Sequence, residues 1–263
     1  MTDPLPISCY IRTLNEARMI GRVIEAARQI AAEVVVVDSG STDATVEIAT
    51  KAGARVTPQP WLGNGKQKRV AEELCTHDWL LDLDADEIVT PAFAAEVRAL
   101  FANGAPPCQI YETKLVTAPP IGEPWMKFGV LDRRKLYDRR VVRQPDHAAW
   151  DQFDVPAGVA VGKLREPLLH YSFPNLEHLA AKLNHWSGIS ARESKLKPFW
   201  WVVLRVLFAR PVYFLKQFVA RGLWRAGIYG YAVAQLSAYG RWLRDIKMLE
   251  IHLKRRQDAH GRS

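Results

Sequence analysis

Two aspartates separated by one residue, Asp84 and Asp86, follow a mostly apolar run at 79–83. Such a run is typical of a strand buried on both faces, so both carboxylates are expected just beyond a strand end. Mg²⁺ and Mn²⁺ prefer oxygen ligands and often share them with substrate phosphates. We therefore interpret the pair as a candidate site for Mg²⁺ or Mn²⁺. A solvated acidic turn is the alternative.

A second acidic cluster follows the β-branched run at 33–37, where the sequence of 37–43 is VDSGSTD. Asp38 ends the predicted strand, and Asp43 lies in the first turn of the next predicted helix. These carboxylates can accept hydrogen bonds from a base edge or a ribose hydroxyl. Helix capping is the alternative, but it does not explain Asp38. The glycine pattern of a dinucleotide site is absent, which argues against a nicotinamide or flavin enzyme.

Two further segments carry polar groups at predicted element ends. After the strand at 7–11 the chain carries Thr13, Asn15 and Glu16, for which a helix N-cap is the simpler interpretation. At 63–68 the sequence GNGKQK places Lys66 at a helix start, where it can face a diphosphate. The spacing is not that of a Walker loop, and a solvated basic turn is equally compatible.

These clusters need a scaffold that brings them together. Predicted strands at 7–11, 33–38, 55–57 and 79–83 alternate with helical patterns, which predicts an α/β fold with a mostly parallel sheet. Ligands of such sheets bind beyond the carboxyl ends of the strands. Three of these four ends carry the acidic and polar clusters, so one site is expected there. The pattern is irregular from 109 to 172 and helical from 175 onward.

Charge is unevenly distributed along the chain. Residues 192–256 contain fourteen Lys and Arg against three Asp and Glu, a net charge of +11, and the remainder carries −3. This layout does not suit a uniformly basic nucleic-acid binder; it suits a domain held to an anionic surface by one end. Three scattered cysteines and the absence of a secretory signal indicate a cytosolic protein.

The basic stretch is also rich in aromatic residues. Its apolar run at 199–208 is interrupted by Arg205 and closed by Arg210 and Pro211, too short for a bilayer span of ~20 residues. From Pro211 a helix is expected, with Lys216 and Arg221 away from its apolar face. That face comprises Phe214, Leu215, Phe218, Val219 and Leu223. Such helices suit the lipid headgroup layer. A docking helix of a globular domain or the interface of an oligomer is the alternative.

The order and spacing of the motifs resemble family 2 glycosyltransferases, which have the GT-A fold. The similarity rests on the start of the first strand with Asn15 and Glu16, on 35–43 and on 79–87. Residues 169–172 and 176–184 resemble a bacterial subgroup, the lipopolysaccharide core β-glucosyltransferases. The resemblance extends over about residues 7–190. The combination of motifs is specific, whereas each motif alone is not.

The resemblance implies roles for individual residues. Asp38 contacts the uracil base, and Asp84 and Asp86 hold ribose and metal. His170 is a candidate further metal ligand, although a structural role is equally compatible. Asp151 is the candidate general base, at a place where the subgroup usually has His-Glu rather than Trp-Asp; Asp146, Asp154 and Glu166 remain alternatives. The full nucleotide-sugar site comprises Thr13, Asn15, Glu16, Asp38, Ser39, Gly40, Asp43, Lys66, Asp84 and Asp86.

We therefore expect an inverting, metal-dependent enzyme that moves a hexose, first of all glucose, from a UDP-sugar to a lipid-linked glycan such as lipopolysaccharide core. Transfer to polyprenyl phosphate and an inactive scaffold that binds nucleotide or membrane are the alternatives. Residues 1–190 form the expected GT-A domain, with donor half 1–104 and acceptor half 105–190. Residues 191–263 form a helical extension, which holds the enzyme peripherally at the inner face of the bacterial inner membrane.

Overall fold

The computed structural model describes residues 3–128 and 130–260, and the chain divides into two compact units. In the described residues, the first unit comprises 3–118 and 130–172, and the second comprises 119–128 and 173–260. The predicted boundary lies later, at residue 190. The difference arises because helix α5 (Leu176–Glu193) packs against helix α7 (Gly227–His260) of the second unit.

The first unit is built on one sheet with the order β3-β2-β1-β4-β7-β6-β9-β5 and with β8 beside β6. Strands β3, β2, β1 and β4 are parallel, and β7 is the first antiparallel neighbour. The strands in the described part of the chain are β1 (Leu5–Thr13), β2 (Ala31–Asp38), β3 (Arg55–Pro58), β4 (Trp79–Asp84), β5 (Glu87–Val89), β6 (Ile110–Thr117), β7 (Leu131–Asp138), β8 (Val161–Lys163) and β9 (Leu168–His170).

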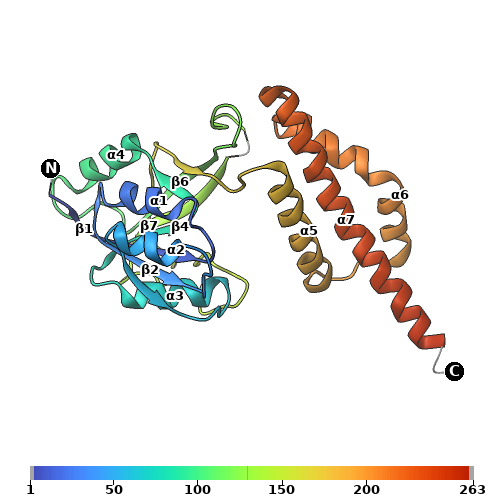
Figure 1. Cartoon of the computed structure of the whole chain (residues 1–263), viewed down its shortest axis with the longest axis horizontal. Coiled ribbons are helices and arrows are strands. Elements are labelled where there is room, and N and C mark those ends of the chain that lie inside the picture. The colour runs from blue at the N-terminus through green and yellow to red at the C-terminus, as the bar shows by residue number, and fades with distance from the viewer. Residues whose placement is uncertain (1–2, 129, 261–263) are drawn as a thin grey trace. The chain divides into compact units, whose positions relative to one another are not determined.

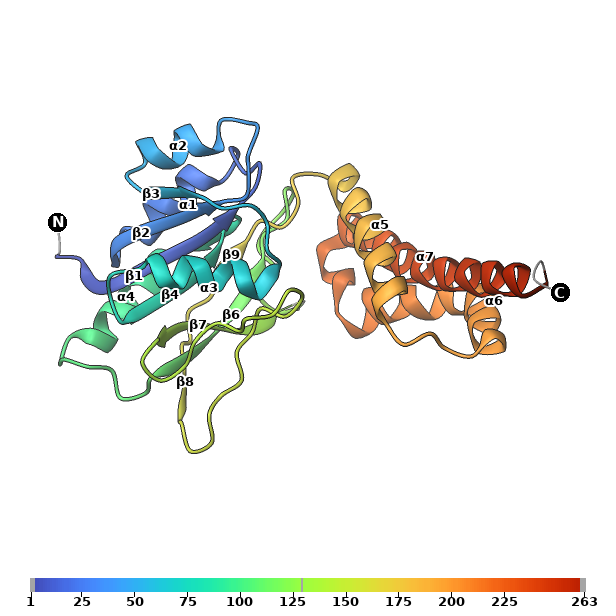
Figure 2. The same cartoon turned by 90° about the horizontal axis from the view of Figure 1, so that it is seen from below.

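Helices cover this sheet on two faces, as Figure 2 shows. They are α1 (Ile20–Ala27), α2 (Thr45–Lys51), α3 (Asn64–Leu74) and α4 (Pro91–Phe101). Alternate side chains of β1 point to opposite faces of the sheet. Cys9 and Ile11 pack in the core under α1 and α4, and Tyr10 packs in the core under α3. All three side chains are fully buried. This two-sided burial confirms the predicted α/β fold with a mostly parallel central sheet.

Strand β7 was not predicted because its sequence, LDRRKLYD, has no apolar run. Its end is nonetheless buried, since Lys135 forms an ion pair of 2.6 Å with the buried Glu87 of β5. Burial would lower the pKa of Lys135, but Glu87 and the neighbouring aspartates outweigh it and raise the pKa well above its usual value. An ion-paired lysine can therefore be buried in the protein interior, on a strand that its hydropathy pattern would assign to the surface.

The second unit is helical. Besides α5 and α7 it contains α6 (Phe199–Leu215), a π-helical turn η1 (Lys216–Ala220) and a 3-10 turn η2 (Leu223–Ala226) (Figure 1). Helix α6 continues through Pro211, where the sequence predicts a break. In the described residues no helix is long and apolar enough to cross a membrane.

The predicted apolar face at 214–223 is only partly buried. Phe214 and Phe218 stack on one another and join the core that contains the buried Leu223, whereas Leu215 and Val219 are exposed. The five residues were expected on one face at a period of 3.6. The separation already appears between Phe214 and Leu215, because neighbouring residues of a helix point about 100° apart and the core covers only part of the expected face.

Candidate active site

The carboxyl ends of β1, β2 and β4 meet at one edge of the sheet. Thr13 of β1 is paired in register with Asp38 of β2, and Arg12 is paired with Asp84 of β4. The predicted convergence of the first three polar clusters is therefore confirmed. It follows from parallel pairing, which brings the carboxyl ends of neighbouring strands to the same edge.

Asp84 lies beside two cations. The Arg12 Nε donates to Asp84 Oδ1 at 2.9 Å, and the Lys68 Nζ lies 3.8 Å from the same oxygen. Burial would raise the pKa of Asp84, but Lys68 and Arg12 outweigh it and hold the pKa well below its usual value. Asp84 is thus held as a carboxylate in a half-buried position.

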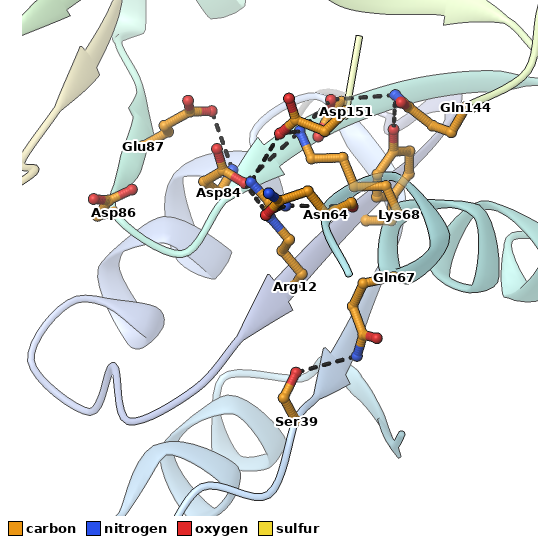
Figure 3. A network of polar contacts seen from close by, with 12 residues as sticks. Arg12, Ser39, Asn64, Gln67, Lys68, Asp84, Asp86, Glu87, Gln144 and Asp151 are labelled. Carbon is orange, nitrogen blue, oxygen red and sulfur yellow. Dashed lines mark hydrogen bonds and ion pairs between the residues drawn. The ribbon is translucent and has the colours of Figure 1, made fainter. Parts of the chain in front are cut away.

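Asp151 shares these two cations. Its Oδ2 lies 3.0 Å from Arg12 Nη2 and 3.5 Å from Lys68 Nζ (Figure 3). The other three candidates for the base lie elsewhere. Asp146 is exposed and 3.9 Å from the exposed Lys66, Asp154 is exposed, and the backbone of Glu166 bonds to Glu96 and Thr113. Asp151 is therefore the candidate that shares a cation with Asp84.

A buried layer supports these carboxylates from below. Lys68 is 1% exposed, and its Nζ lies 2.8 Å from the fully buried Asp82. Gln144 Nε2 donates to Tyr10 Oη at 2.6 Å and contacts Asp82 Oδ2 at 3.3 Å. Because a buried charge needs a partner of opposite sign, this layer fixes where Lys68 can sit.

Asp86 lies apart from Asp84 and beside His170, as Figure 3 shows for the two aspartates. His170 Nε2 is 3.1 Å from Asp86 Oδ2, because β5 and β9 are paired with Glu87 opposite His170. Burial would lower the pKa of His170, but the hydrogen bond and charge of Asp86 outweigh it and raise the pKa above its usual value of 6.5.

Of the three predicted metal ligands, the structure thus brings two together, and the third faces Arg12. The described residues contain no group of three or more His, Cys, Asp or Glu arranged to hold a metal ion. Asp86 and His170 supply one oxygen and one nitrogen donor side by side. Such a pair fits a cation that takes its remaining ligands from substrate phosphates and water.

The turn after β2 uses its own carboxylate. Asp38 is buried, and its oxygens accept bonds from Gly40 N, Ser41 N and Ser41 Oγ. Gly40 has a φ of 99°, which an L side chain rarely adopts. Ser39 Oγ accepts from Gln67 Nε2 at 3.1 Å. The carboxylate expected to read a base therefore also shapes the turn that surrounds it.

The loops after β1 and β2 brace one another. Asn15 Oδ1 accepts from Thr42 N at 2.8 Å, and Asp43 Oδ2 accepts from Ala17 N at 3.2 Å. The backbone carbonyl of Glu16 accepts from the amides at the start of α1. Unlike these bonded groups, the Thr13 hydroxyl is unsatisfied: its Oγ1 is buried without a hydrogen-bond partner among the described residues. It is the kind of orphaned group that a bound ligand satisfies.

The start of α3 does not present a free anion site. Its amides at Asn64, Gly65 and Lys66 donate to the backbone carbonyls of His147 and Ala148. These amides are the groups that a helix N-terminus otherwise offers to a phosphate. The side chain of Lys66 is exposed. Lys68, two residues further into the helix, is the lysine that reaches Asp84.

The glycines of this turn are explained by the loop that lies on them. A Cβ at Gly63 would lie 2.4 Å from Ala148 O, and a Cβ at Gly65 would lie 2.2 Å from Trp150 O. Asn64 completes the contact: its Nδ2 donates to Ala149 O, and its Oδ1 accepts from Arg12 Nη1. The turn thus seats the 145–151 segment, which carries Asp151.

Sequence patterns missed the residues that tie the site together, namely Arg12, Asn64, Gln67, Lys68 and Gln144. Each acts through a partner far away in the chain, so its local sequence carries little information. One signal was present: Arg12 is a charged residue within the apolar first strand.

A family model described as Glycosyl transferase family 2 matches residues 8–142. An uncharacterized glycosyltransferase of Rickettsia bellii is 34% identical over 94% of this chain and 87% of that protein. The lipopolysaccharide core biosynthesis glycosyltransferase LpsC of Rhizobium meliloti is 31% identical over 96% of this chain and 95% of that protein.

Among solved structures, a glucosyl-3-phosphoglycerate synthase of Mycobacterium tuberculosis is 27% identical over 41% of this chain and 43% of that chain, with a TM-score of 0.36. The family assignment rests instead on the family model and on the two full-length relatives. Both the predicted GT-A fold class and the predicted enzyme class are confirmed. The chain is a glycosyltransferase and belongs to glycosyl transferase family 2.

Proposed function

We propose that this glycosyltransferase moves a hexose, with glucose as the first candidate, from a UDP-sugar to a lipid-linked glycan such as lipopolysaccharide core, and inverts the anomeric carbon. The observation that carries this proposal is the pairing of Asp84 and Asp151 on one guanidinium at the sheet edge. It joins a carboxylate of the donor half to a carboxylate of the acceptor half. Donor and acceptor must meet at such a place.

Asp151 is the proposed general base. The acceptor hydroxyl oxygen forms a bond to the anomeric carbon, the bond from that carbon to the diphosphate oxygen breaks, and the hydroxyl proton passes to the Asp151 carboxylate. Attack from the face opposite the leaving diphosphate inverts the centre. Arg12 and Lys68 fix the position of the Asp151 carboxylate, which is what a base requires before the reaction.

The donor is proposed to lie over the ends of β1 and β2. The orphaned Thr13 hydroxyl and the carboxylate of Asp84 provide an acceptor-rich surface for base and ribose, while Asp38, Ser39 and Gly40 shape the turn beside it. A Mg²⁺ or Mn²⁺ ion would be held by Asp86 and His170. When bound, it neutralises charge on the diphosphate.

The acceptor proposal draws on LpsC, a relative described as a lipopolysaccharide core biosynthesis glycosyltransferase, and on the helical unit. Arg205 turns inward to the buried Asp245 at 2.9 Å. Helix α6 thereby exposes a row of apolar side chains: Trp200, Trp201, Leu204, Leu207, Phe208, Val212 and Leu215. An apolar face beside a +11 segment suits the inner face of a bacterial inner membrane, with its anionic lipids.

The test of the base is Asp151→Asn, with Asp154→Asn as the matched control. The amide cannot accept the proton, so turnover with a deacylated lipopolysaccharide core acceptor should fall by about 10²–10⁴-fold while UDP binding persists. Asp154→Asn should keep normal turnover. Full activity of Asp151→Asn would remove the base assignment. Wild-type protein that binds UDP but transfers no hexose from any UDP-sugar would favour the scaffold.

The membrane proposal is tested with vesicles of phosphatidylglycerol and of phosphatidylcholine. Wild-type protein should bind the anionic vesicles at low salt and lose part of that binding at high salt, because basic residues near the surface contribute ~1 kcal/mol each. Trp200→Ser with Leu207→Ser should weaken binding in both salt conditions. If the wild-type protein does not bind anionic vesicles at low salt, the exposed face of α6 contacts protein rather than lipid.

A further inference from the structure

The helical unit contains a pocket of about 330 Å³ that has no part in the proposed transfer reaction. It lies between α5 and α7, which run beside one another in Figure 1, and Gln217 of the π-helical turn η1 forms part of its lining. A cavity of this volume is within the range of small-ligand sites. Its lining combines apolar surface with hydroxyl and amide groups and three arginines: Leu183, Trp186, Ser187, Ser190, Gln217, Arg221, Ser237, Gly240, Arg241 and Arg244.

The three arginines of the pocket have too few anionic partners. Arg244 Nη2 lies 3.3 Å from Asp245, but that carboxylate also pairs with Arg205 at 2.9 Å. Arg244 Nε is buried and has no hydrogen-bond acceptor within the described residues. Within the part of the chain that the structure describes, the Arg221 side chain contacts only the neutral Gln217, at 3.5 Å.

Arg241 is the most exceptional of the three. It is half-buried, and among residues 3–128 and 130–260 it has neither a carboxylate partner nor a hydrogen-bond acceptor. Burial first, and then the charges of Arg221 and Arg244, lower its pKa below the usual value for arginine. Arg221 is exposed, and Arg241 and Arg244 are half-buried. Three guanidinium groups that line one pocket repel one another unless an anion lies between them.

The remaining lining groups suit an oxyanion. Guanidinium groups form two parallel hydrogen bonds with phosphate oxygens, and the hydroxyls of Ser190 and Ser237 line the same space. Gly240 permits the approach of α5, since a Cβ there would lie 2.9 Å from Leu183 Cβ. No carboxylate lines the pocket, so a cationic ligand is disfavoured.

We propose that this pocket binds the phosphate group of an organic phosphate. A lipid headgroup and a soluble phosphate ester share this chemistry, and the test separates them. The proposal does not depend on the identity of the sugar donor or on Asp151 as the base, because the pocket lies entirely within the helical unit.

The experiment measures binding of inorganic phosphate to the full-length protein by calorimetry, at fixed ionic strength and with UDP present to fill the donor site. Wild-type protein should bind one phosphate and melt at a higher temperature with phosphate. Arg241→Gln should weaken binding by about tenfold, the loss expected for one charged hydrogen-bond partner. Arg241→Lys should bind with intermediate affinity. Arg255→Gln, on α7 but outside the pocket, should bind like wild type.

Among the described residues, Arg241→Gln removes no hydrogen bond or ion pair, and it relieves repulsion, so the melting temperature without phosphate should not fall. Glycerol 1-phosphate and phosphatidylglycerol vesicles then identify the source. Binding of the soluble ester that depends on Arg241 supports a free phosphate ester, and binding of the vesicles that depends on Arg241 supports a lipid headgroup. Absence of phosphate binding in the wild type, or undiminished binding in Arg241→Gln, overturns the proposal.

Discussion

Replacing Gly65 by alanine should separate catalysis from folding in this enzyme. Gly65 lies in the first turn of α3, where alanine is conformationally favourable, but the segment that carries Asp151 covers it. The new Cβ would lie 2.2 Å from Trp150 O, 2.6 Å from Pro145 O and 2.8 Å from His147 O. All three are backbone atoms, so the 145–151 segment must move rather than one flexible side chain.

The magnitude follows from these distances. Restoring ordinary van der Waals separation requires a shift of about 1 Å, and a misplacement of about 1 Å costs about 10²-fold in turnover. Stability should change less. Alanine in place of glycine stabilises a helix by about 0.5–1 kcal/mol, which offsets part of the loss of the two backbone hydrogen bonds to His147 O, each contributing about 0.5–1.5 kcal/mol.

The assay compares UDP release in the presence of a deacylated core acceptor, UDP binding and urea unfolding. Gly65→Ala should lose turnover and retain UDP binding. The control is Gly188→Ala in α5, where the nearest atom to the new Cβ is Lys247 Nζ at 3.5 Å, an ordinary contact. Normal turnover of Gly65→Ala would refute the inference that the glycine turn positions Asp151. If Asp151→Asn is fully active, the base assignment fails instead.

Three further predictions concern metal, acid stability and the buried layer. Asp86→Ala should lose Mn²⁺-dependent UDP binding while UDP binding without metal is unchanged, by calorimetry. Glu33, only 16% exposed, has a pKa lowered from 4.5 to about 2; burial opposes this shift, and hydrogen bonds from Ser8, Arg55 and Thr76 outweigh it. Glu33→Gln should therefore cost about 2–3 kcal/mol at neutral pH, a difference that is complete above pH ~4.5 and disappears as pH falls towards ~2 in urea titrations. Lys68→Met strands the buried Asp82 and should cost about 3–5 kcal/mol, part of which a second change, Asp82→Asn, restores.

The sheet and the place of the site could be predicted because both depend on local patterns. Apolar runs mark β1, β2 and β4, and parallel pairing then brings the groups after them to one edge. Strand β7 could not be predicted in this way, since Lys135 is buried through an ion pair with Glu87 that is 48 residues away. Local hydropathy cannot detect a partner at that separation.

The site shows the same distinction at the level of single residues. Asp84 and Asp151 could be named from their sequence neighbourhood and from family resemblance. That both lie on Arg12 could not be predicted, because the contacts span 72 and 139 residues. Lys66 was expected to face a diphosphate because it starts a helix behind glycines. Those glycines instead admit the backbone of another loop, a role that the sequence GNGKQK does not reveal.

The contact between α3 and the 145–151 segment also provides a spectroscopic signal. The first amides of a helix have no partner within the helix and normally exchange their hydrogens rapidly with water. Here the amides of Asn64, Gly65 and Lys66 are bonded to His147 O and Ala148 O, so their protection depends on the position of that segment rather than on the integrity of α3. Hydrogen exchange at these three amides therefore measures the opening free energy of the segment that carries Asp151, independently of catalysis.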